Sequence, residues 1–133
     1  MNTDFTVPKT DNPIQLKDRM LELQNMYSSV AEELTQARLE MDTLDSALSY
    51  IRDKAFLSLD SGTVEEKKAR SKVEVKIEVP YIEKGKEVKK ELTYHNCKYL
   101  LLKANSRVGR MWLYLEELKS AIAVCQMFPT KGL

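Results

Sequence analysis

The sequence contains few of the residues from which catalytic and metal sites are built. Its 133 residues include one histidine, His95, and two cysteines, Cys97 and Cys125, whereas a zinc site needs about four such ligands close together. A hydrolytic triad on His95 would need a nucleophile in a recognisable setting, and the chain has neither a nucleophile-elbow motif nor a papain-like cysteine motif. The four glycines stand apart, so there is no glycine-rich phosphate loop. We therefore expect no catalytic residue, no metal and no cofactor, and predict that the protein is not an enzyme.

Long apolar runs are also missing. Stretches such as Tyr99–Leu102 are far shorter than the roughly 20 residues that span a bilayer, and the N-terminus lacks the basic-then-apolar pattern of a signal peptide. On one predicted helix, Cys97 and Cys125 would be separated by a rise of about 42 Å, which precludes a disulfide between them. We therefore predict a cytoplasmic protein that makes no contact with a membrane.

Glycine and proline are scarce, at four residues each, whereas 43% of residues are hydrophobic and 31% are charged. This composition predicts a single folded domain over residues 1–133. The net charge of +1 conceals an asymmetry, because residues 1–64 hold 6 basic and 11 acidic side chains and residues 65–110 hold 13 basic and 7 acidic ones. Such a chain can pair with itself or offer its basic part to a polyanion.

A heptad pattern of apolar residues dominates the first half of the chain. Residues 1–10 have no periodicity and are predicted to form a flexible arm, after which Asn12 and Pro13 have the form of a helix start. The pattern predicts one helix over residues 13–59, of roughly 45 residues. Its apolar seam comprises Leu16, Met20, Leu23, Tyr27, Val30, Leu34, Ala37, Met41, Leu44, Leu48, Ile51 and Ala55.

The segment over residues 63–94 is basic and less regular. Residues 63–66 have the spacing of a capping box, which predicts the start of a short helix. Four β-branched residues then alternate with charged ones over residues 73–79, ahead of Pro80. One interpretation is a β-hairpin over residues 72–94 with a glycine in its turn, and the other is a helix broken at Pro80. The strict alternation favours the hairpin.

The heptad pattern then returns and predicts a second helix over residues 94–127, which Pro129 would end. Its apolar seam comprises Tyr94, Cys97, Leu101, Ala104, Val108, Met111, Leu115, Leu118, Ile122 and Cys125. The predicted fold class is therefore mainly α, with two long antiparallel heptad-patterned helices in a coiled-coil hairpin or bundle. A short helix and a β-hairpin would lie between them.

Further apolar residues lie beside both seams, among them Leu21, Phe56, Tyr99 and Trp112. They widen each apolar stripe beyond the seam that two helices need, which favours a bundle of three or more helices. A homo-oligomer would supply the additional helices. The alternative is a monomer in which the middle segment folds back as a third element.

The remaining candidate for function is a set of basic residues with tyrosines among them. The set comprises Lys67, Lys68, Arg70, Lys72, Lys84, Lys86, Lys89, Lys90, Lys98, Lys103, Arg107 and Arg110. Cations beside aromatic rings are typical of single-stranded nucleic acid binding, where the cations contact phosphates and the rings stack on bases. The opposing interpretation is a solvated face, because seven acidic residues occupy the same stretch.

From Ala55 onward, about half of the chain resembles a group of small helical proteins encoded by double-stranded DNA phages, often among replication and recombination genes. The residues that carry this resemblance are 55–57, at the end of the first predicted helix, 62–69, 99–103 and 115–120, and the Val-rich stretch over residues 73–79 departs from it. The resemblance implies a helper of phage DNA metabolism, or a protein that binds a host factor in the host cytoplasm. It implies no catalytic residue.

Two heptad-patterned helices joined through a β-hairpin also resemble, in architecture alone, the subunits of the prefoldin chaperones. The capping box and basic helix after Gly62 depart from that plan. Our first hypothesis is therefore a non-enzymatic oligomeric interaction protein that binds a host or phage protein of DNA metabolism. The second is a single-stranded DNA-binding or recombination accessory protein, and the third is a prefoldin-like chaperone.

Overall fold

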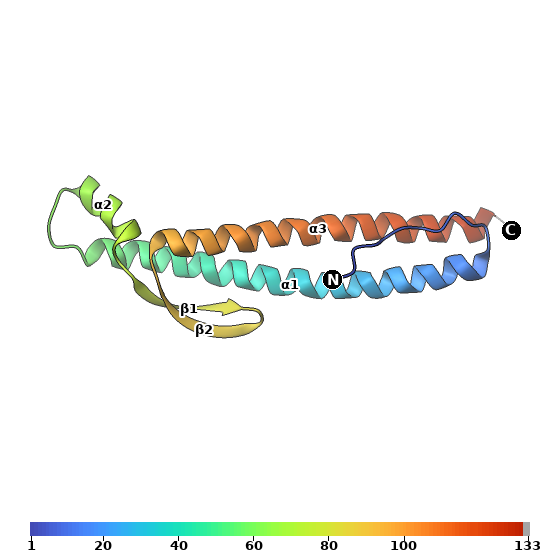
Figure 1. The fold of residues 1–133 in the computed structure, drawn as a ribbon, viewed down its shortest axis with the longest axis horizontal. Helices are drawn as coiled ribbons and strands as arrows, with labels where there is room; N and C mark the ends of the chain where they lie inside the picture. The colour runs from blue at the N-terminus through green and yellow to red at the C-terminus, as the bar shows by residue number, and fades with distance from the viewer. Residues whose placement is uncertain (132–133) are drawn as a thin grey trace. The chain divides into compact units, whose positions relative to one another are not determined.

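A computed structural model describes residues 1–131 of the chain, and the side chains of residues 1–127. In chain order, the elements are α1 (Pro13–Leu57), α2 (Val64–Val73), β1 (Ile77–Glu83), β2 (Lys86–Leu92) and α3 (Tyr94–Lys131) (Figure 1). The protein is therefore mainly helical with one small antiparallel sheet, as predicted. None of its described helices has an apolar stretch that would reach across a bilayer.

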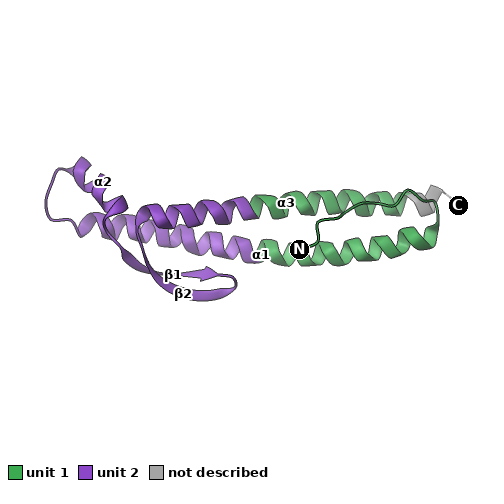
Figure 2. Ribbon diagram, in the orientation of Figure 1, with its two compact units in different colours: residues 1–35, 108–133 green, residues 36–107 purple. Residues whose placement is uncertain are grey.

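The chain forms two compact units (Figure 2). Unit 1 contains residues 1–35 and the residues from 108 onward, whereas unit 2 contains residues 36–107. The long helices α1 and α3 each contribute one part to each unit. All residues of the two predicted seams are buried or partly buried within these units.

In unit 1, the first part of α1 lies beside the last part of α3 (Figure 1). Asn12 caps the start of α1, because its side-chain oxygen accepts a hydrogen bond from the backbone N–H of Ile14 at 3.0 Å. The buried apolar residues of this unit are Leu16, Leu23, Val30, Leu34, Val108, Met111, Leu115, Leu118, Ala121 and Cys125. Their burial is the main stabilising contribution to a unit built of two helical segments.

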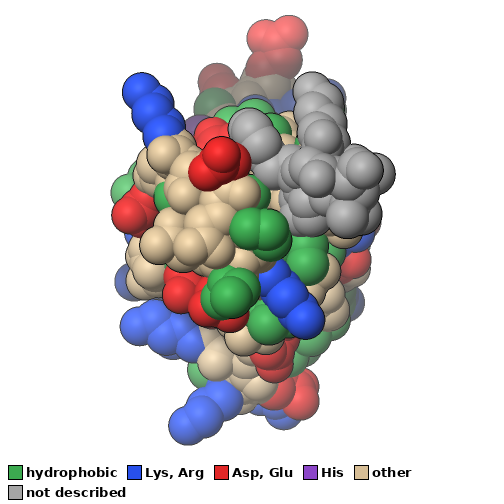
Figure 3. Space-filling view, turned by 90° about the vertical axis from the view of Figure 1, so that its right-hand side faces the viewer, with side chains coloured by type: hydrophobic (Ala, Val, Ile, Leu, Met, Phe, Trp, Pro, Cys, Tyr) green, Lys and Arg blue, Asp and Glu red, His purple; other side chains and the backbone are tan. Residues whose placement is uncertain are grey.

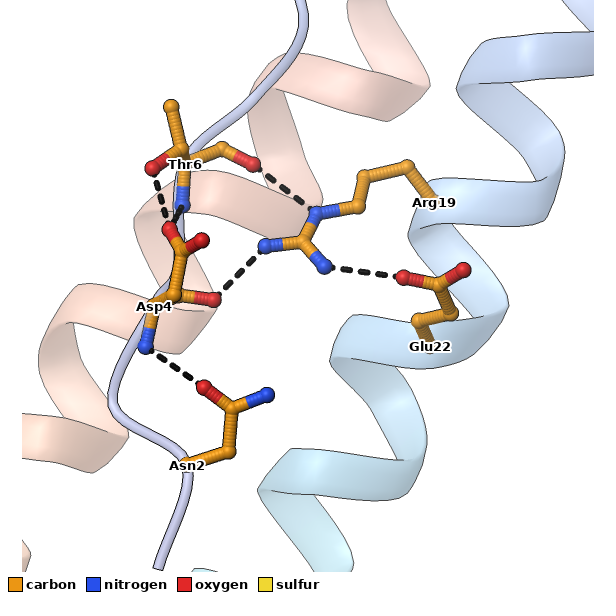
Figure 4. Close-up of polar contacts among 5 residues, drawn as sticks. All are labelled: Asn2, Asp4, Thr6, Arg19 and Glu22. Carbon is orange, nitrogen blue, oxygen red and sulfur yellow. Dashed lines mark hydrogen bonds and ion pairs between the residues drawn. The ribbon is translucent and has the colours of Figure 1, made fainter.

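The predicted flexible arm has no regular secondary structure and lies against both helices of unit 1. The Arg19 guanidinium donates hydrogen bonds to the backbone carbonyls of Thr6 at 2.8 Å and Asp4 at 2.7 Å (Figure 4). The ring of Phe5 contacts that of Tyr114 edge-on, with 5.8 Å between centroids. The hydroxyl and the backbone N–H of Thr6 donate to the Asp4 carboxylate and lower its pKa.

In unit 2, the β-hairpin packs on the last part of α1 and the first part of α3 (Figure 2). The core of this unit comprises Leu44, Ala47, Ile51, Ala55, Val79, Tyr81, Leu92, Cys97 and Ala104. The two helices run antiparallel here, because Leu44 contacts Cys97 while the earlier Glu40 contacts the later Arg107. The hairpin is thus the third element that covers the two helices within this unit.

The hairpin is held to α1 by two side chains of that helix. Thr43 accepts a hydrogen bond from the backbone N–H of Ile82 at 2.9 Å, and Glu40 accepts one from that of Lys84 at 2.7 Å. Lys84 and Gly85 form the turn, with φ of 52° and 79°. Two consecutive positive φ values are those of a type I′ turn, which matches the twist of the flanking strands.

The structure corrects several predicted boundaries. The hairpin does not begin at residue 72, because the capping box of Thr63 and Glu66 starts a helix that continues to Val73, so β1 begins at Ile77. Helix α1 ends at residue 57 rather than 59. Helix α3 continues to residue 131 rather than 127, so Pro129 lies within its last turn and does not end it. Proline lacks the N–H that would bond to the carbonyl four residues earlier, so it weakens the last turn and leaves the turns before it intact.

Candidate interaction site

A pocket of about 530 Å³ opens in unit 2, where the end of α1, the helix α2 and the start of α3 meet. It is lined by Arg52, Asp53, Phe56, Leu57, Lys68, Ser71, Lys72 and Tyr94. The volume lies within the range of about 300–1,000 Å³ that is typical of ligand-binding pockets. We therefore take this pocket as the candidate site.

The walls of the pocket are mainly apolar. Phe56 and Tyr94 are half-buried, whereas Leu57 has 74% of its surface exposed. The buried Ser71 hydroxyl donates to the backbone carbonyl of Lys68 at 3.0 Å, so its polar atom is already satisfied. The pocket thus presents apolar surface that another molecule would cover with a gain in free energy.

The charged side chains that line the pocket, here called its rim, are mainly basic. The rim holds Arg52, Lys68 and Lys72 against a single carboxylate, Asp53, which gives a formal charge of +2. The Lys72 ammonium also lies 5.7 Å from the centroid of the Tyr94 ring. An apolar pocket with a positive rim favours a ligand that joins an apolar group to a negative charge.

Three of the twelve predicted basic residues are in ion pairs with carboxylates and are therefore less available to a polyanion. The pairs are Arg70 with Glu74 at 3.1 Å, Lys90 with Glu83 at 3.0 Å, and Arg107 with Glu40 at 3.3 Å. The hydrogen bond from Lys90 lowers the pKa of Glu83 and raises the pKa of Lys90 itself.

The other predicted basic residues are distributed over several surfaces. Only Lys68 and Lys72 line the pocket. Lys98 and Lys103 lie over tyrosine rings, at 5.9 Å from the centroid of Tyr94 and 5.4 Å from that of Tyr99. Lys67 is half-buried in α2, Lys84, Lys86 and Lys89 are exposed on the hairpin, and Arg110 belongs to unit 1.

The outward face of the hairpin is not basic. Successive strand residues point to opposite faces, so the face opposite Val79 and Tyr81 is formed by the alternate positions. The residues of this face are Glu78, Pro80, Ile82, Glu87, Lys89 and Glu91. Three carboxylates and one ammonium give it a formal charge of −2, which is unfavourable for contact with phosphates.

Charges of both signs are mixed in unit 1 as well. On the face of the molecule in Figure 3, acidic and basic side chains alternate with apolar and uncharged ones. The described residues of both units contain no group of three or more His, Cys, Asp or Glu side chains placed to hold a metal ion. Cys97 in unit 2 and Cys125 in unit 1 are buried free thiols.

Sequence reasoning named half of the residues that line the pocket but did not predict the pocket. It included Lys68, Lys72 and Tyr94, but it did not relate them to Arg52 or Leu57, which lie on a different helix. The only available signal was Phe56, an apolar residue beside the predicted seam. Comparisons with protein families, with curated proteins and with solved structures give no match.

Proposed function

We propose that this chain is a non-enzymatic interaction protein whose unit 2 binds another protein. The observation that carries this proposal is the pocket between α1, α2 and α3, with its apolar walls and basic rim. Protein interfaces combine an apolar centre with polar groups around it. An exposed Leu57 beside two half-buried aromatic rings has the composition of such a centre.

The distribution of charge favours a protein partner over single-stranded nucleic acid. A nucleic acid strand is bound by cations that follow its phosphates over several nucleotides. Here Arg70, Lys90 and Arg107 are paired with carboxylates, and the outward face of the hairpin has a negative formal charge. The other predicted basic residues are therefore better suited to a local contact with a protein than to contact with an extended nucleic acid strand.

The resemblance of residues 55–57, 62–69, 99–103 and 115–120 to small phage proteins suggests which partner to look for. On that resemblance, the partner is a host or phage protein of DNA metabolism. A prefoldin-like chaperone would instead bind many unfolded chains. It would therefore prevent the aggregation of an unrelated denatured protein, whereas a specific interaction protein would not.

Self-association through unit 1 is the second part of the proposal. This unit leaves Ile14 and Leu113 with 71% and 64% of their surfaces exposed, and a second copy of the chain would bury such apolar surface with a gain in free energy. We expect sedimentation analysis to give a mass above the 15.3 kDa of one chain, and Leu113→Glu to reduce it. Ser120→Glu adds the same charge at an exposed position of unit 1 and is the control. A mass of one chain at all concentrations would refute self-association.

The experiment that tests the proposed function is affinity capture from a nuclease-treated lysate of the cells that make the protein. We expect the tagged chain to retain a defined protein after nuclease treatment. Capture that disappears on nuclease treatment, together with a salt-sensitive gel shift of a labelled oligonucleotide, would favour direct nucleic acid binding instead. Failure to retain any protein would contradict the proposal.

A further inference from the structure

We infer that the pocket binds an acidic segment of the partner that inserts one aromatic or large aliphatic side chain between α1 and α2. This inference rests on the proposed function and specifies the chemistry of the partner. It is drawn from the apolar walls, from the position of the cations on the rim, and from the single carboxylate among them.

The apolar part of the pocket determines what the inserted side chain must be. Phe56 and Leu57 at the end of α1 line the pocket together with Tyr94 at the start of α3, and Ser71 of α2 contributes a polar atom that is already hydrogen-bonded. The Ser71 hydroxyl therefore needs no partner from the ligand, and an aromatic or leucine side chain would cover the exposed surface of Leu57.

The cations determine where the acidic residues lie. Lys68 and Lys72 are four residues apart on α2, so they project from the same side of the helix. On the α1 side, the carboxylate of Asp53 lies 3.5 Å from the guanidinium of Arg52 and partly offsets its charge. The carboxylates of the partner would therefore pair mainly with the two lysines of α2.

Tyr94 links these two parts of the pocket. Its ring forms part of the wall, while the ammonium groups of Lys72 and Lys98 lie 5.7 and 5.9 Å from its centroid. Cations over a ring are attracted to its negative face. This arrangement keeps Lys72 beside the apolar wall, where a carboxylate next to the inserted side chain can reach it.

The experiment uses the full chain and four fluorescein-labelled probes in fluorescence polarisation. The first is a short peptide with one tryptophan flanked by glutamates. In the second, glutamines replace the glutamates, in the third, alanine replaces the tryptophan, and the fourth is an oligothymidylate of similar length. We expect the first peptide to bind most tightly. The second and third peptides should each bind at least about fivefold more weakly than the first. Added salt should weaken the binding of the first peptide.

Matched variants assign the binding to the pocket. The double substitution Lys68→Glu with Lys72→Glu should weaken the binding of the first peptide by about tenfold or more. Lys86→Glu with Lys89→Glu changes the net charge equally in the same unit, but these residues lie on the hairpin and do not line the pocket, so binding should be retained. Leu57→Ser tests the apolar wall with little risk to folding, because Leu57 is exposed. Circular dichroism should show the same helical content in all variants.

Several outcomes would overturn the inference. They are equal binding of the glutamate and glutamine peptides, unchanged binding by the variant at residues 68 and 72, and no binding of any peptide up to millimolar concentration. Tight binding of the oligothymidylate that this variant abolishes would assign the pocket to nucleic acid. If the variant still captures the cellular partner of the wild-type chain, the inference about the pocket fails while the proposed function stands.

Discussion

Glu40 of α1 forms an ion pair with Arg107 of α3 in unit 2, with 3.3 Å between its Oε2 atom and the Nη1 atom of Arg107. The other carboxylate oxygen of Glu40, Oε1, accepts a hydrogen bond from the backbone N–H of Lys84 in the hairpin turn at 2.7 Å. One carboxylate therefore joins both long helices and the hairpin. The two side chains are only 14% and 27% exposed, so this pair should contribute more to stability than a pair on the open surface.

Replacing Glu40 by alanine should destabilise the protein by about 1–3 kcal/mol, because it leaves the mostly buried Arg107 without this carboxylate and removes the acceptor for Lys84. Urea unfolding followed by circular dichroism measures this change. Glu40→Gln retains an acceptor for the N–H of Lys84 and should be less harmful. Glu87→Ala, at an exposed hairpin position, is the control and should change stability by less than about 0.5 kcal/mol. Equal effects of Glu40→Ala and Glu87→Ala would contradict this role.

Substitutions at the two adjacent residues of the hairpin turn should change the stability of the protein in opposite directions. Lys84 has a positive φ of 52°, which asparagine tolerates better than lysine, so Lys84→Asn should stabilise the protein by a few tenths of a kcal/mol. Gly85→Ala should cost about 1 kcal/mol. A Cβ at residue 85 would meet no atom within 4 Å, so this cost would arise from the backbone conformation alone. Thermal unfolding of the two variants measures both effects, and the same sign for both would contradict the prediction.

The buried thiol of Cys97 predicts a dependence of stability on pH. Burial raises the pKa of Cys97 from 9.0 to about 11. Between these values the thiol ionises in the unfolded chain but stays protonated in the folded one, so the unfolded state binds fewer protons and stability falls as pH rises from about 9 to about 11. Tyrosines and lysines titrate in the same range, so the comparison is between wild type and Cys97→Ala in urea unfolding at several pH values. The variant should lose less stability with rising pH, and parallel curves would contradict the prediction.

The contacts of the N-terminal arm can be tested by proteolysis. Arg19 donates to the carbonyls of Asp4 and Thr6, so Arg19→Ala should release the arm and speed tryptic cleavage after Lys9. Glu22→Ala removes only the 2.8 Å ion pair of Arg19 with a neighbour on α1 and is the control. Mass spectrometry of the early fragments measures the cleavage rate. Equal cleavage of wild type and Arg19→Ala would mean that these hydrogen bonds do not hold the arm.

The helical class and the hairpin could be predicted from the sequence, because both depend on local periodicity. Apolar steps of three and four residues placed Leu16, Ile51 and Leu118 on buried helix faces, and all three are fully buried. The alternation over residues 73–79 favoured a strand, and β1 is present. The start of β1 was wrong because the capping box carries α2 through Val73, where local helix propagation prevails over β propensity.

The pocket could not be predicted in the same way, because its residues come from three helices. No periodicity in the sequence relates Leu57 to Lys68 and Tyr94. The basic residues were grouped by their closeness in sequence, whereas the fold pairs Lys90 with Glu83 and Arg107 with Glu40. The pairing of charges is a property of tertiary structure, and a count of lysines along the chain therefore overstates the positive surface.

Site-specific photo-crosslinking tests the central claim most directly. A benzophenone amino acid in place of Leu57 would lie at the wall of the pocket, and the same group in place of Glu87 would lie on the outward face of the hairpin. Irradiation in the lysate should give a nuclease-resistant adduct to one protein from position 57, and this adduct should be lost when Lys68 and Lys72 are both changed to Glu. Adducts to nucleic acid, or equal adducts from positions 57 and 87, would contradict the assignment of the pocket as a protein-binding site.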